Sequence, residues 1–149
     1  MLSDARAPAP VSRFMILRET LISAVINSLF SALFFAAIFG FKQAPAVQAL
    51  GRDCLPQAFM VALMGSLVPG LILRRHSGKS VAVVVRTAVL LAIGSLLVFG
   101  GGACAIFLGM GATAIAVEPA LIAKIALGAA ISIVVTPIAV LTLFRPATR

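Results

Sequence analysis

The stretch that decides the fold is residues 55–75, LPQAFMVALMGSLVPGLILRR. It contains no charged residue until it ends in Arg74 and Arg75. An apolar run of about 20 residues is long enough to cross the hydrocarbon core of a bilayer as a helix. Small residues recur at every fourth position, on one face of that helix: Ala58, Ala62, Ser66 and Gly70. The stretch therefore predicts a transmembrane helix with a face suited to close packing.

The composition of the whole chain agrees with this prediction. Hydrophobic residues make up 62% of the chain and charged residues 11%, and the mean hydropathy is +1.18. Soluble domains have roughly 45–50% apolar and about 25% charged residues, so a soluble domain is excluded. A β-barrel is also excluded, because barrel strands alternate polar and apolar residues and these runs are apolar on all sides.

The predicted fold class is all-α, a polytopic membrane protein with four transmembrane helices arranged as two tandem hairpins. The expected spans are about 20–41, 55–73, 87–108 and 125–144. The expected organisation is a cytoplasmic tail at 1–18, a first hairpin at 19–80 and a second hairpin at 81–149.

Basic residues predict the orientation. They gather at cytoplasmic ends of membrane proteins, and this chain has a net charge of +8. One side of the predicted topology holds nine of them: Arg6, Arg13, Arg18, Arg74, Arg75, Lys79, Arg86, Arg145 and Arg149. The other side holds Lys42, Arg52 and Lys124. Both termini are therefore expected in the cytoplasm.

The cluster Arg74, Arg75, Lys79 and Arg86 is expected at the cytoplasmic surface, next to anionic lipid. Nucleic acid is not an expected partner, because no basic segment is interleaved with aromatic residues.

A shift of 68 residues aligns the two halves without a gap. Arg18 then falls on Arg86, and Pro69 falls on Pro137. We interpret this as an internal repeat, in which two hairpins are related by a pseudo-twofold axis along the membrane normal. The two prolines are expected to kink their helices, and whether they act as hinges stays open.

Small residues spaced by four also mark other spans. They are Ala24, Ser28, Ala32, Ala36 and Gly40 in the first span, and Gly128 and Ser132 in the fourth. Such stripes let helix backbones approach closely in lipid. They predict a tight bundle, and they also suit a face for self-association or for docking of another membrane protein.

Little in the sequence indicates catalysis. The acids Asp4, Glu19, Asp53 and Glu118 are placed in tails or at span ends, and no basic residue is expected within a span. We interpret Glu19 beside Arg18, and Asp53 beside Arg52, as local pairs. Cys54 and Cys104 are both expected near the outer face, as free thiols or as a disulfide.

The most polar side chain expected inside the membrane is Asn27, which aligns with Ser95 in the 68-residue register. We predict that Asn27 makes an interhelical hydrogen bond, with a ligand contact as the alternative. No catalytic residue, cofactor or metal ligand is predicted, and the chain is not expected to be an enzyme.

The hairpin whose second helix reads MVALMGSLVPGLILRR, repeated as ISIVVTPIAVLTLFR, is similar to that of uncharacterised small bacterial inner-membrane proteins built from two-helix hairpins. The resemblance implies a location in the inner membrane and no activity.

The function expected from the sequence is association between helices in the bacterial inner membrane. The chain would act as an oligomer or as an accessory subunit of a larger membrane complex. The alternative is a small oligomeric transporter or channel for a small solute.

Overall fold

The structure of the protein is a computed structural model. It describes residues 13–144, with their side chains except those of 75–77 and 144. Its helices are α1 (Arg13–Ile38), α2 (Val47–Ser77), α3 (Val81–Ser95), the π-helical turn η1 (Leu96–Gly100), α4 (Gly101–Gly109) and α5 (Val117–Phe144). The elements α3, η1 and α4 follow one another without a break and form one span. Four helices are thus long and apolar enough to cross a membrane. The predicted all-α fold class is confirmed, and the chain has the build of a multi-pass membrane protein.

Every helix begins before the span predicted for it, and α2 and α3 begin at Val47 and Val81. The first helix begins at Arg13, so the end of the predicted tail is helical. The last helix begins at Val117, eight residues before the expected start at Ile125. Lys124 therefore lies inside α5 and not in a loop, which corrects the prediction that no basic residue lies within a span.

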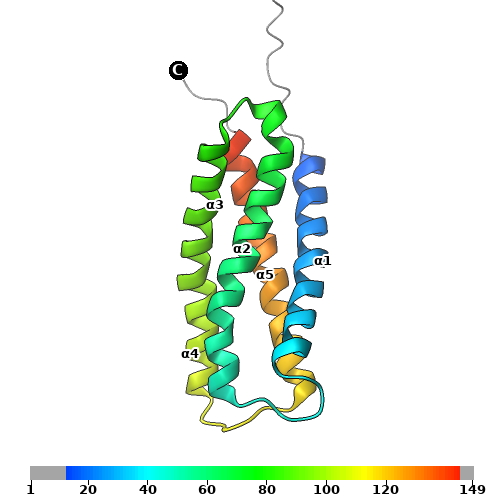
Figure 1. Ribbon diagram of the computed structural model, residues 1–149, viewed down its shortest axis with the longest axis vertical. Coiled ribbons are helices and arrows are strands. Elements are labelled where there is room, and N and C mark those ends of the chain that lie inside the picture. Colours follow the sequence, from blue (N-terminus) through cyan, green and yellow to red (C-terminus); the bar gives the residue numbers. More distant parts are fainter. Residues whose placement is uncertain (1–12, 145–149) are drawn as a thin grey trace, which may run out of the picture.

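The helices form a bundle with a central pair and two outer helices (Figure 1). The central helices are α2 and α5, which pack along each other. Outer helix α1 packs chiefly on α5, and the third span packs on α2, at the opposite side of the bundle. Each outer helix thus packs mainly against the central helix that is not its own hairpin partner, and the two hairpins interlock.

The two loops at one end of the bundle are joined by backbone hydrogen bonds. The N–H of Val47 donates to the carbonyl of Thr113 at 3.1 Å, and the N–H of Ile115 donates to the carbonyl of Pro45 at 3.2 Å. They flank an isolated antiparallel bridge between Ala46 and Ala114. The link between α2 and α3 lies at the other end, with the first turn of α1 and the last turn of α5 (Figure 1).

Close backbone contact holds the third span against α2. Gly100 is buried, and a Cβ at this position would lie 3.1 Å from the Cα of Leu55 and 3.2 Å from the carbonyl oxygen of Cys54. The π-helical turn of the third span ends at Gly100, which packs against the backbone of α2.

The small-residue stripes divide into buried and half-buried ones. Those of the central helices face the interior: Ala58, Ala62, Ser66 and Gly70 in α2, and Gly128 and Ser132 in α5, are all buried. In α1 the residues Ala24, Ser28, Ala32 and Ala36 are only half-buried, and Gly40 lies beyond the helix end. The buried residues of α1 are instead Thr20, Asn27, Ser31 and Phe35. The face of α1 that points into the bundle is thus a polar one, and the small-residue stripe lies beside it.

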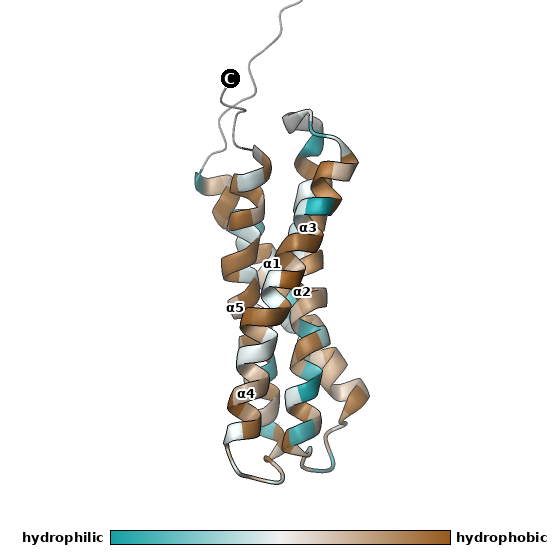
Figure 2. Cartoon of the chain, turned by 90° about the vertical axis from the view of Figure 1, so that its left-hand side faces the viewer, coloured by the Kyte–Doolittle hydropathy of each residue, from teal (hydrophilic) through white to brown (hydrophobic). Residues whose placement is uncertain are grey.

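The outward surface of the bundle is apolar. Hydrophobic colour covers most of every helix in Figure 2. Large exposed side chains include Leu29, Phe30 and Leu33 on α1 and Leu97 and Val98 on the third span. Such a surface suits contact with lipid chains, which agrees with the four candidate spans.

Candidate functional site

A band of hydrogen-bonded polar side chains lies between α1, α2 and α5. We call it the polar seam: Ser23, Asn27 and Ser31 of α1, Gln57 of α2, and Ser132 and Thr136 of α5. The three α1 residues are spaced by four, so they lie along one face of that helix. Asn27 was predicted from the sequence as a polar side chain inside the membrane, whereas Gln57 was not.

Asn27 is the centre of the seam and is 3% exposed. Its Nδ2 donates to Ser132 Oγ at 2.7 Å and to Ser23 Oγ at 3.2 Å. Its backbone carbonyl accepts from Ser31 Oγ at 2.8 Å. The predicted interhelical hydrogen bond of Asn27 is confirmed, and it joins α1 to α5. Ser95, its counterpart in the 68-residue register, is buried in α3, which packs on α2.

Thr136 connects the seam to the proline of α2. Its Oγ1 lies 3.0 Å from Ser23 Oγ and 3.1 Å from the carbonyl oxygen of Gly65. A carbonyl only accepts and a hydroxyl has one proton, so Thr136 donates to Gly65 and accepts from Ser23. Pro69 has no N–H, so the carbonyl four residues before it, that of Gly65, loses its helical partner. Thr136 replaces that partner from a neighbouring helix.

Pro69 and Pro137 both lie inside helices that continue past them. Thr136 directly precedes Pro137 in α5. The described hydrogen bond instead serves Pro69 of α2. A kink or a hinge at these prolines stays a prediction.

Gln57 continues the seam toward the loop end of the bundle. Its Nε2 donates to Ser31 Oγ at 2.8 Å and to the backbone carbonyl of Lys124 at 2.9 Å. Its Oε1 is buried and is the one buried side-chain polar atom without a hydrogen-bond partner among the described residues. Buried acceptors are almost always satisfied, so this atom needs a physical explanation.

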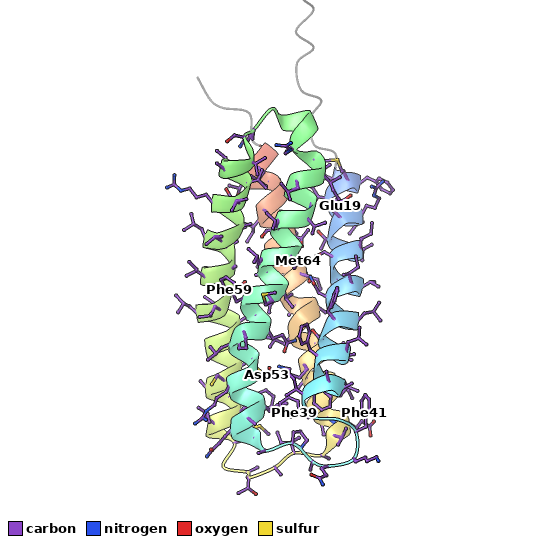
Figure 3. The ribbon with its side chains drawn as sticks, viewed as in Figure 1. Glu19, Phe39, Phe41, Asp53, Phe59 and Met64 are labelled. Atoms are coloured by element: carbon purple, nitrogen blue, oxygen red, sulfur yellow. The ribbon has the colours of Figure 1, made fainter. Side chains whose placement is uncertain are left out.

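The seam ends at an ion pair inside the bundle. Lys124 Nζ lies 2.5 Å from Asp53 Oδ2, and the two side chains are 1% and 18% exposed. The same ammonium lies 4.0 Å from Cys54 Sγ. The interpretation of Asp53 as a local partner of Arg52 is therefore wrong. Figure 3 labels Asp53 in the half of α2 near the loops, and Glu19 near the opposite end of α1.

The other predicted pair is present. Arg18 donates to Glu19 at 3.2 Å, on an exposed part of α1. The two cysteines are free thiols, Cys54 buried and Cys104 half-buried. In the described part of the chain, no group of three His, Cys, Asp or Glu residues could hold a metal ion.

The predicted basic cluster lies around the link between α2 and α3. Lys79 Nζ donates to the carbonyl of Thr142 at 3.1 Å, which ties this link to the last turn of α5. Arg86 is exposed on α3, and the side chain of Arg75 lies outside the described residues. At least one member of the cluster thus has a structural contact in addition to any contact with lipid.

Two hollows flank α1. A crevice of about 80 Å³ lies between α1 and α2, and its lining includes Ser23, Asn27 and Glu19. An open apolar groove lies between α1 and α5, lined by Ala24, Val25, Ser28, Leu29, Ala32 and Ile125. The groove contains three members of the α1 small-residue stripe. The crevice reaches the polar seam, and the groove faces outward.

The geometry of the seam ties three of the bundle's helices together. Along α5 it runs from Lys124 to Thr136, about 18 Å at a rise of about 1.5 Å per residue. Its hydroxyls bond to carbonyls one turn back or to side chains across the interface, so it joins three helices.

Comparisons with protein families, with curated proteins and with solved structures found no match to this chain.

Proposed function

We propose that this chain is a non-enzymatic membrane protein that acts through helix association, with the groove between α1 and α5 as its contact face. The first occupant that we propose is the corresponding face of a second copy of the chain. The same face would serve if the chain were an accessory subunit of a larger membrane complex.

The observation that supports this proposal is the position of the α1 stripe. The interior of the bundle is held to α1 by Asn27 and Ser31, on the neighbouring face. Ala24, Ser28 and Ala32 are left half-buried along an open groove, beside the larger Val25 and Leu29. Small residues flanked by larger ones form the hollow into which a second helix packs in lipid.

We also propose the inner membrane of a bacterium as the location, with both termini in the cytoplasm. The described basic residues support this orientation. Arg18, Lys79 and Arg86 lie toward the end with the α2–α3 link, and Lys42 and Arg52 lie toward the end with the paired loops. A majority of basic residues at one end marks the cytoplasmic end.

Purification in a mild detergent tests the association. We expect the wild-type chain to be larger than one copy and Ser28→Leu to be monomeric, because leucine fills the groove without entering the bundle. Ala37→Leu is the matched control, since Ala37 is exposed elsewhere on the same helix. A monomeric wild-type chain without a stoichiometric partner would contradict the proposal.

Transport of a small solute is the second candidate function, and the buried ion pair favours it. Ionisable residues inside membrane proteins often mark ion or proton pathways. Here Lys124 and Asp53 connect to Asn27 through Gln57 and Ser31. Flux into liposomes that is lost in Asn27→Leu would support transport. Equal flux in empty and protein-containing liposomes would exclude it.

A further inference from the structure

The ion pair and Gln57 leave polar groups that the protein itself does not satisfy. We infer that an internal water molecule binds between Gln57 Oε1, Lys124 Nζ and the carboxylate of Asp53, about two helical turns inside the loop end of the bundle. This inference does not rest on the proposed association.

The orientation of the Gln57 amide is fixed by its neighbours. The carbonyl oxygen of Lys124 can only accept, and it lies 2.9 Å from Gln57 Nε2. The hydroxyl of Ser31 donates its proton to the carbonyl of Asn27, so it must accept from Nε2 as well. A flipped amide would place two acceptors against each other. Oε1 therefore remains the buried atom that needs a donor.

Lys124 has a donor left over. An ammonium group has three N–H donors. One is directed at Asp53 Oδ2 at 2.5 Å, and a second can reach only the weak acceptor Cys54 Sγ at 4.0 Å. The third has no acceptor among the described residues. Asp53 likewise uses only one of its two carboxylate oxygens in the described hydrogen bonds.

These three groups belong to side chains that are neighbours in the bundle. Asp53 and Gln57 are four residues apart on α2, so their side chains are neighbours on one helix face. Lys124 contacts both of them, through its ammonium group and its backbone carbonyl. A buried water needs two to four polar partners. Here one water can donate to Gln57 Oε1 and to Asp53 and can accept from Lys124.

The proposed site has a route to solvent. Lys124 is 1% exposed, whereas Asp53 is 18% exposed and lies near the paired loops. Water can therefore exchange past the Asp53 carboxylate. The Lys124 ammonium group is then hydrated inside the bundle. This hydration does not require a continuous water passage across the bundle.

Radiolytic labelling in H₂¹⁸O tests the site, because hydroxyl radicals formed from a bound water oxidise the nearest side chains. Cys54 is fully buried and lies next to the Lys124 ammonium, so bulk radicals cannot reach it. We expect ¹⁸O incorporation at Cys54, and a several-fold loss of it in Gln57→Met. Labelling of Cys104 should be equal in both proteins and is the internal control. Equal Cys54 labelling in the two proteins, or none in the wild type, would overturn the inference.

A second measurement applies if Gln57→Met does not fold. A crystal structure of the wild-type protein grown from a lipid phase should show ordered density within hydrogen-bonding distance of Gln57 Oε1 and Lys124 Nζ. A direct hydrogen bond between these two atoms, or an apolar side chain between them, would also overturn the inference.

Discussion

Lys124 of α5 and Asp53 of α2 form an ion pair inside the bundle, with 2.5 Å between Nζ and Oδ2. The two residues come from different hairpins and pack where the central helices face each other. A buried ion pair is not in itself strong evidence for stability, because both charges lose their hydration. Its contacts with Gln57 place it at one end of a hydrogen-bonded seam that also holds α1.

Removing one charge of this pair should destabilise the protein. In Lys124→Met the carboxylate of Asp53 loses its partner but keeps some access to water. We expect the free energy of unfolding to fall by about 3 kcal/mol, the lower end for a broken buried pair. Asp53→Leu should cost more, because the ammonium of Lys124 is almost fully buried. Unfolding in mixed micelles measures both.

The double variant Lys124→Met, Asp53→Leu tests whether the two charges interact. Its loss in free energy of unfolding should be smaller than the sum of the losses in the two single variants, since no unpaired charge remains. Additive costs would show that the two side chains act independently and would contradict the ion pair.

The hydrogen bond from Thr136 to Gly65 should depend on the proline of α2. Thr136→Val removes the donor and should lower the free energy of unfolding by about 1 kcal/mol. In a Pro69→Ala background the helix regains an N–H for the Gly65 carbonyl, so the same change should cost much less. An equal cost in both backgrounds would mean that Thr136 does not replace the missing donor.

The crossing of α1 and α5 requires a glycine at position 128. A Cβ there would overlap the Ser31 hydroxyl and would lie 3.2 Å from the carbonyl oxygen of Asn27. We expect Gly128→Ala to lower the free energy of unfolding by about 1–3 kcal/mol, because the added methyl group overpacks the interface. Gly94→Ala is the control, because no atom lies within 4 Å of its added Cβ and alanine favours helix. Similar stability of the two variants would contradict this close crossing.

The number and type of the spans were predictable because hydropathy and length alone decide them. The packing stripe of α2 was also predictable, since Ala58, Ala62 and Ser66 lie in a helix that contacts neighbours on several sides. The burial of Lys124 could not be predicted from the sequence. It lies just before an unbroken apolar run, and only Asp53, far away in the sequence, makes its burial possible.

The inward face of α1 shows a second limit of sequence reasoning. Small residues spaced by four and polar residues spaced by four both occur on this helix, on adjacent faces. In this structure the polar face points into the bundle, because Asn27 and Ser31 form hydrogen bonds with residues of α5 and α2. The partners of a polar face depend on which helices become neighbours. The connectivity of the hairpins does not determine that choice.

The face of α1 that bears Ser28 is where we propose that this protein associates. The most direct test is energy transfer between donor-labelled and acceptor-labelled copies in lipid vesicles, measured as the protein-to-lipid ratio changes. We predict specific transfer for the wild type and for Ala37→Leu, and at least a tenfold weaker association for Ser28→Leu, about 1.4 kcal/mol. Transfer no higher than random proximity for the wild type, or unchanged transfer for Ser28→Leu, would contradict the claim.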